Sequence, residues 1–119
     1  MTDNKRIFTL KEAQQLLPQV RALTAAAAAG AASLEAELAR AGTDAARSHL
    51  ASQSQALRRD WARDVEALGC DVKGLWLVDF DSGDGIYYCW QYPEAQLEFF
   101  HDYDSGFAGR RPLGGLLVN

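Results

Sequence analysis

The fold is decided by residues 9–41, which read TLKEAQQLLPQVRALTAAAAAGAASLEAELARA. Thr9 and Glu12 have the S/T-x-x-E spacing of a capping box, which satisfies backbone N–H groups at the start of a helix. Apolar or small residues then recur at alternating steps of three and four, a spacing typical of a helix that packs along a partner helix. Pro18 lies inside this pattern, and because the spacing keeps its phase we expect one kinked helix. The positions are Leu10, Ala13, Leu17, Val20, Thr24, Ala27, Ala31, Leu34, Leu38 and Ala41.

A second helix is indicated after Gly42, with Thr43 or Asp44 as its N-cap. Gly69 is placed to end this helix in a left-handed C-terminal cap. Its apolar stripe comprises Leu50, Leu57, Trp61, Val65 and Leu68. The two stripes together predict a long helical hairpin over residues 9–68.

From residue 71 the pattern changes to one of alternating residues rich in aromatic and branched side chains, which predicts strands. Short polar turns between the strands favour an antiparallel arrangement. The predicted strands are 75–80, 86–92 and 97–101, and the turns are 81–84 and 93–96. The expected fold is therefore α+β, a single domain (1–119) in which the hairpin precedes a three-stranded antiparallel β-meander and an irregular C-terminal tail (71–119).

Four-residue turns would place Asp79 and His101 on one sheet face, on either side of Tyr88. Strand spacing then separates their Cα atoms by ~12 Å, too far for direct contact. Both sheet faces are largely apolar, and the hairpin can cover only one. The other face must meet the tail, a second subunit or a ligand. The hairpin is also longer than the strands, so we expect a homodimer formed through the hairpin or through a sheet face.

Charge and composition restrict the possible functions. The 119 residues include 12 basic and 16 acidic side chains, a net charge of −4, and an acidic chain without a basic stripe is a poor nucleic-acid binder. The apolar run 23–32 is dominated by alanine and is too short for a membrane span. The N-terminus has no signal-peptide pattern, and Cys70 and Cys89 lie far apart as expected for free thiols. These features predict a cytoplasmic protein.

Residues 101–112 hold the densest group of reactive side chains. His101 is a candidate acid/base or metal ligand, and Asp102 and Asp104 could orient it or share a metal. Arg110 could bind a carboxylate or phosphate through its fork of N–H donors. The alternative is structural: a strand end, turns made by glycine, and an arginine paired with an acidic neighbour.

Asp79 lies between apolar residues of a predicted strand, so its carboxylate needs a partner, such as Arg110 or a helix arginine. The candidate ligand-binding residues are Asp79, Tyr88, Trp90, His101 and Arg110, and the candidate metal ligands are His101, Asp102 and Asp104. No cofactor is indicated, since the sequence contains no phosphate loop, dinucleotide fingerprint or nucleophile elbow.

Several segments resemble a bacterial family catalogued as domain of unknown function 2203. They are Phe8–Ala13 with Leu16-Leu17-Pro18, Leu77–Phe80, Cys89-Trp90, and His101 with Gly106–Arg110. The resemblance implies one cytoplasmic domain with helices before the sheet, and no established activity. It directs interest to Asp79, Trp90, His101, Phe107, Gly109 and Arg110. The chain departs from the family pattern at Asp81, where Pro is usual, and at Arg111, where Gln usually precedes the proline.

Two functions follow as hypotheses. The first is a dimerising interaction or small-ligand-binding module. The second is a small metal-assisted hydrolase that uses the segment from His101 to Arg110. The sequence leaves open whether the protein is an enzyme.

Overall fold

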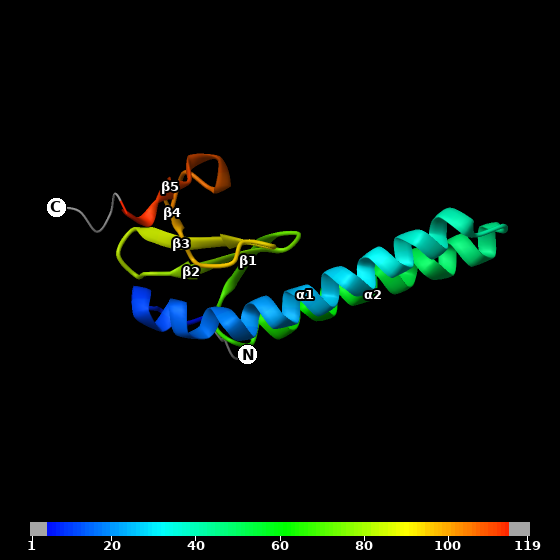
Figure 1. Ribbon diagram of the computed structural model, residues 1–119, viewed down its shortest axis with the longest axis horizontal. Coiled ribbons are helices and arrows are strands. Elements are labelled where there is room, and N and C mark those ends of the chain that lie inside the picture. Colours follow the sequence, from blue (N-terminus) through cyan, green and yellow to red (C-terminus); the bar gives the residue numbers. More distant parts are fainter. Residues whose placement is uncertain (1–4, 115–119) are drawn as a thin grey trace.

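A computed structural model describes residues 5–114. Two helices, α1 (Leu10–Arg40) and α2 (Asp44–Glu66), form an antiparallel hairpin that precedes the sheet. Figure 1 shows that the hairpin extends well beyond one end of the sheet, and the molecule measures 59 × 33 × 25 Å. The predicted order of helices and sheet is confirmed.

The helix ends follow from the sequence signals. The Thr9 hydroxyl accepts a hydrogen bond from the Glu12 N–H, and the Glu12 carboxylate accepts one from the Thr9 N–H, so the capping box is complete. Thr43 caps α2 in the same way, through the Ala46 N–H. The chain leaves α2 through Gly69, whose φ of +99° is a conformation that L-residues rarely adopt.

The helices contact each other along the predicted stripes. The buried positions of α1 are Ala13, Leu17, Val20, Thr24 and Ala31, and those of α2 are Trp61 and Val65. The Trp61 Nε1–H donates to the Thr24 hydroxyl at 2.9 Å, and that hydroxyl donates to the Val20 carbonyl at 2.7 Å. The Thr24 hydroxyl, which is buried at the helix–helix interface, therefore has both a hydrogen-bond donor and an acceptor.

Within residues 5–114 the sheet has five antiparallel strands in the order β1-β2-β3-β4-β5, not the three expected. They are β1 (Asp71–Gly74), β2 (Leu77–Asp81), β3 (Ile86–Gln91), β4 (Phe99–Asp102) and β5 (Arg111–Pro112). The two additional strands are short and lie at the edges, which is why alternation did not reveal them. The tail is correspondingly more regular than expected: it contains the 3₁₀ turn η1 (Phe107–Gly109) and returns to the sheet as β5.

The register differs from the predicted pairing at both turns. Asp81 pairs with Tyr87, and Tyr88 pairs with Phe100. In the first turn Gly83 and Gly85 have φ angles of +74° and +89°, so the chain reverses later than a regular four-residue turn would allow. Each pairing is displaced by an odd number of residues, and an odd displacement moves a strand's side chains to the opposite face. The two displacements together keep β2 and β4 in the predicted relation to each other. They reverse the two faces of β3 relative to the prediction.

One face of the sheet packs on the first half of α1 and the end of α2. Val78, Phe80, Tyr88, Trp90 and Phe100 belong to this helix-facing side and join the main core. Phe8 completes the core, since its ring meets Phe80 edge-on at a centroid distance of 5.3 Å. The outer face carries Leu77, Asp79, Tyr87, Cys89, Phe99 and His101.

Candidate functional site

Asp79 and His101 form a buried pair on the outer face of the sheet. The His101 Nε2 atom lies 2.8 Å from Asp79 Oδ2, and the two side chains are 3% and 1% exposed. The prediction that they are too far apart for contact is therefore wrong. Their strands are separated by β3, in which Cys89 pairs with Asp79 and Tyr87 pairs with His101, so the two side chains meet diagonally. Because cysteine is small, the imidazole and the carboxylate meet across it.

The hydrogen-bond partners of His101 determine where its protons lie. Nδ1 is 2.8 Å from the Asp102 carbonyl, which only accepts, so we assign the Nδ1 proton as the donor. Nε2 and the Asp79 carboxylate then share one further proton. Burial raises the pKa of Asp79 above its ordinary value, and the adjacent His101 opposes that shift.

Cys89 completes a group of three potential ligand residues. One ligand atom each from Asp79, Cys89 and His101 lies within 4.8 Å of the others, and all three residues are buried. Burial raises the pKa of the Cys89 thiol to about 12. Within the described chain, the second carboxylate oxygen of Asp79, Oδ1, accepts no hydrogen bond from an N–H or O–H group, and the Cys89 thiol, a weak donor, interacts with the same carboxylate. A buried carboxylate oxygen without an N–H or O–H donor is costly, and this one lies beside a thiol and an imidazole.

A cavity of about 270 Å³ lies over the Asp79–His101 pair. Asp79 and His101 contribute to its lining with Lys73, Leu77, Tyr103, Gly106 and Phe107. Lys73 also places its ammonium over the Tyr87 ring, and the Tyr103 hydroxyl donates to Asp81 at 2.6 Å. The cavity is thus a small space with a polar floor between the sheet and the chain that follows β4.

Arg110 holds that chain segment against the sheet (Figure 1, orange). Its guanidinium donates to both carboxylate oxygens of Glu94, at 2.8 and 2.7 Å, and to the Cys89 carbonyl at 3.1 Å. It also lies over the rings of Phe99 and Phe107. The expectation that Arg110 pairs with Asp79 is wrong, because Asp79 pairs with His101 and Arg110 with Glu94.

The other predicted site residues lie elsewhere. Tyr88 and Trp90 belong to the helix-facing core, where the Trp90 indole donates to the Glu94 carbonyl. Asp102 is exposed and its carboxylate pairs with Arg111, so it contributes only its carbonyl to His101. Asp104 is exposed. The structure therefore brings together Asp79 and His101 from the predicted set.

Sequence reasoning missed Cys89 and Lys73. Cys89 faces the site only if β3 has the observed register, and the assumed turn length concealed it. Lys73 lies on the short strand β1, which alternation did not predict. The sequence signal that could have revealed the orientation of Cys89 is Gly85, because a glycine at a hairpin end favours a bulge that changes the strand register.

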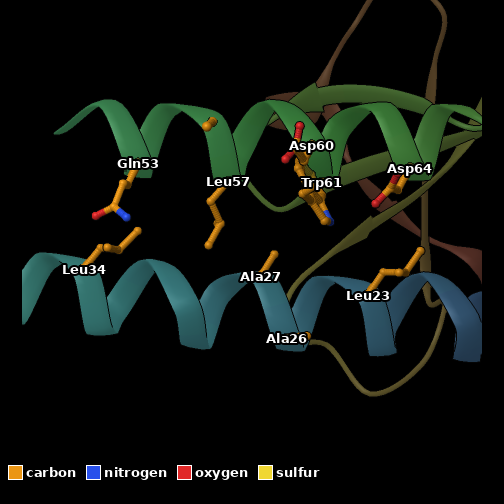
Figure 2. Close-up of a pocket in the computed structure, with 10 residues that line it drawn as sticks. Leu23, Ala26, Ala27, Leu34, Gln53, Leu57, Asp60, Trp61 and Asp64 are labelled. Carbon is orange, nitrogen blue, oxygen red and sulfur yellow. The ribbon is translucent and has the colours of Figure 1, made fainter. Parts of the chain in front are cut away.

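A second hollow, of about 550 Å³, runs along the hairpin between α1 and α2. Figure 2 shows Leu34 of α1 and Leu57 of α2 pointing toward the opposite helix, with Leu23 and Trp61 toward the sheet end. Gln53 and Asp64 contribute polar atoms at its edge. This groove is mainly apolar and holds no cluster of reactive groups.

The helices of the described chain include none long and apolar enough to cross a membrane. Comparisons with curated proteins and with solved structures returned no match. The profile of a family described as an uncharacterized conserved protein, DUF2203, matches residues 6–113. That range includes both helices, the sheet and the cavity. The match confirms the resemblance seen in the sequence, and the chain belongs to the DUF2203 family.

Proposed function

We propose that the protein is a small-ligand-binding module whose ligand occupies the cavity over Asp79 and His101. The observation that carries this proposal is the Oδ1 atom of the buried Asp79 carboxylate, which has no N–H or O–H donor. A cavity of about 270 Å³ is at the small end of ligand sites, so the ligand is an ion or a small metabolite. Because the free group is a carboxylate oxygen, the ligand presents a positive charge or a hydrogen-bond donor.

The experiment is a titration with methylammonium, guanidinium and Zn²⁺, followed by thermal unfolding and by NMR of the His101 imidazole. We expect at least one of these probes to raise the unfolding temperature of the wild type and to leave Asp79→Asn unchanged. Asp102→Asn is the matched control, since Asp102 is an exposed carboxylate beside the site. No response from the wild type, or an equal response from Asp79→Asn, would overturn the proposal.

A second candidate function is self-association through the hairpin, with the hairpin of a second copy as occupant of the groove in Figure 2. Its support is that the apolar groove lies on the part of the hairpin that extends beyond the sheet. On the α1 side of the groove, residues 22–34 contain no charged side chain, and the charged groups of its lining are Asp60 and Asp64 of α2.

Size-exclusion chromatography with light scattering at micromolar concentration tests this dimer. We expect twice the 13.0 kDa chain mass for the wild type and the monomer mass for Ala26→Arg, which places a charge in the groove. Ala39→Arg is the control, at an exposed α1 position outside the groove. A monomeric wild type would refute self-association. Two buried free thiols also fit a reducing compartment, and on that ground we propose a cytoplasmic location.

A further inference from the structure

We propose that the ligand of this site is a divalent transition-metal ion, Zn²⁺, bound by Asp79, Cys89 and His101. This inference rests on the proposed function, since it names the ligand of the same cavity. A carboxylate oxygen, a thiolate sulfur and an imidazole nitrogen form a mixed donor set that suits zinc, whereas calcium and magnesium require oxygen ligands.

The geometry requires little adjustment to admit the ion. The three ligand atoms lie within 4.8 Å of one another. Around a tetrahedral zinc ion with bonds of about 2.0–2.3 Å, neighbouring ligand atoms are about 3.3–3.8 Å apart. Nε2 and Oδ2 are 2.8 Å apart, a separation typical of atoms bridged by a proton, so they must separate by about half an ångström.

The imidazole is already oriented as a metal ligand. Its Nδ1–H donates to the Asp102 carbonyl, which directs Nε2 toward Asp79. In zinc proteins the second ring nitrogen of a ligating histidine is characteristically held by such a carbonyl or carboxylate. Arg110 donates to the Cys89 carbonyl and so helps to fix the backbone of that ligand residue.

Replacing protons by Zn²⁺ leaves the net charge of the site unchanged. Without metal the site holds one proton shared by Asp79 and His101 and one on the Cys89 thiol, and its net charge is zero. Zn²⁺ replaces these two protons, which leave to solvent, while Asp79 and Cys89 become anionic ligands and His101 a neutral one. The net charge stays zero, so the buried site gains no uncompensated charge.

The test begins with protein that has been stripped of metal by dialysis against a chelator. We expect one equivalent of Zn²⁺ to bind in competition with a chromophoric chelator, with two protons released per ion. Co²⁺ in place of Zn²⁺ should give a thiolate-to-cobalt charge-transfer band in the near ultraviolet. This spectrum needs no variant, so it remains decisive even if a substitution disturbs folding.

Cys89→Ser and His101→Gln should each weaken Zn²⁺ binding by at least ~10–100-fold, the loss that even an outer-shell partner causes. Cys70→Ser and His49→Gln are matched controls, with the same residue types outside the cluster, and should bind like the wild type. Absence of stoichiometric Zn²⁺ binding, or equal binding by Cys89→Ser, would overturn the zinc site. If methylammonium or guanidinium binds while Zn²⁺ does not, the metal inference fails and the ligand-binding function stands. If none of the three binds, both fail.

Discussion

Arg110→Lys tests whether the segment after β4 controls access to the site. The measurement uses a Cys70→Ser background, so that Cys89 is the single thiol. Burial raises the pKa of Cys89 to about 12, so a thiol reagent at pH 8 reaches a reactive thiolate only when the site opens. The labelling rate therefore reports how often the covering segment leaves the sheet.

The magnitude follows from the contacts of the guanidinium. Arg110 makes three hydrogen bonds, two to Glu94 and one to the Cys89 carbonyl, and lies over two aromatic rings. Lysine keeps one charged contact and loses about two of the hydrogen bonds, each worth about 1.5–3 kcal/mol when a charged group takes part. Taking the lower value because the pair is partly exposed gives about 3 kcal/mol. Since 1.4 kcal/mol is a factor of ten, opening should become ~100-fold more frequent.

The assay compares Cys89 labelling by mass spectrometry in the two proteins, with the free energy of unfolding from urea titration alongside. We expect faster labelling of Arg110→Lys at urea concentrations far below its unfolding midpoint. As a control, the same comparison is made in a Cys89→Ser background, where Cys70 is the single thiol. Arg110→Lys should not raise the labelling rate of Cys70 to a comparable extent. Equal acceleration at both cysteines would mean that unfolding is global, and an unchanged Cys89 rate would refute the role of Arg110.

Three further predictions concern stability. Burial raises the pKa of the Cys70 thiol to about 12, so the folded state keeps a proton that the unfolded state loses above its ordinary pKa near 9. The free energy of unfolding should therefore fall as pH rises from 9 toward 12, and Cys70→Ser should reduce that fall by up to ~1.4 kcal/mol per pH unit. Gly69→Ala should cost at least ~1 kcal/mol because of its positive φ and its closeness to a neighbouring side chain, whereas Gly42→Ala, with open space around it, should change little in the same urea titration. Thr24→Val should cost about 1–3 kcal/mol because it leaves the Trp61 N–H buried without an acceptor, and the cost should shrink in a Trp61→Phe background; additive effects in this double-mutant cycle would contradict it.

The hairpin could be predicted from the sequence because its signals are local. Capping at Thr9 and Thr43 and the glycine at 69 mark helix ends through hydrogen bonds within a few residues. The heptad spacing then determines which face is buried, whatever the distant chain does. These features do not depend on how the sheet pairs.

The candidate site could be predicted only in part because it depends on strand register. Asp79 and His101 were identified by residue type, and their shared face was correct because two odd errors cancelled. Cys89 was missed because the predicted register put Ile86, Tyr88 and Trp90 on this face in place of Tyr87 and Cys89. Cys89, which is small, lies directly beside Asp79 and leaves room for the imidazole to reach the carboxylate. A turn that is three residues away from the site therefore determines its chemistry.

The contribution of the buried Asp79–His101 pair to the free energy of unfolding distinguishes a structural role of the pair from a functional one. A buried ion pair rarely stabilises a fold more than an apolar pair would, and the Oδ1 atom of Asp79, which has no N–H or O–H donor, adds a further cost. Asp79→Asn has nearly the same shape, and its amide can donate to His101 Nε2 while Nδ1–H still donates to the Asp102 carbonyl.

If the group serves binding, Asp79→Asn should therefore keep or raise the free energy of unfolding, measured in urea at pH 7, while it loses Zn²⁺. If the pair serves the fold, the same variant should lose about 3–5 kcal/mol, the usual cost of breaking a buried pair. A loss of that size would show that Asp79 is retained for stability, and a stable variant that no longer binds would show that the fold gives up stability to hold a ligand.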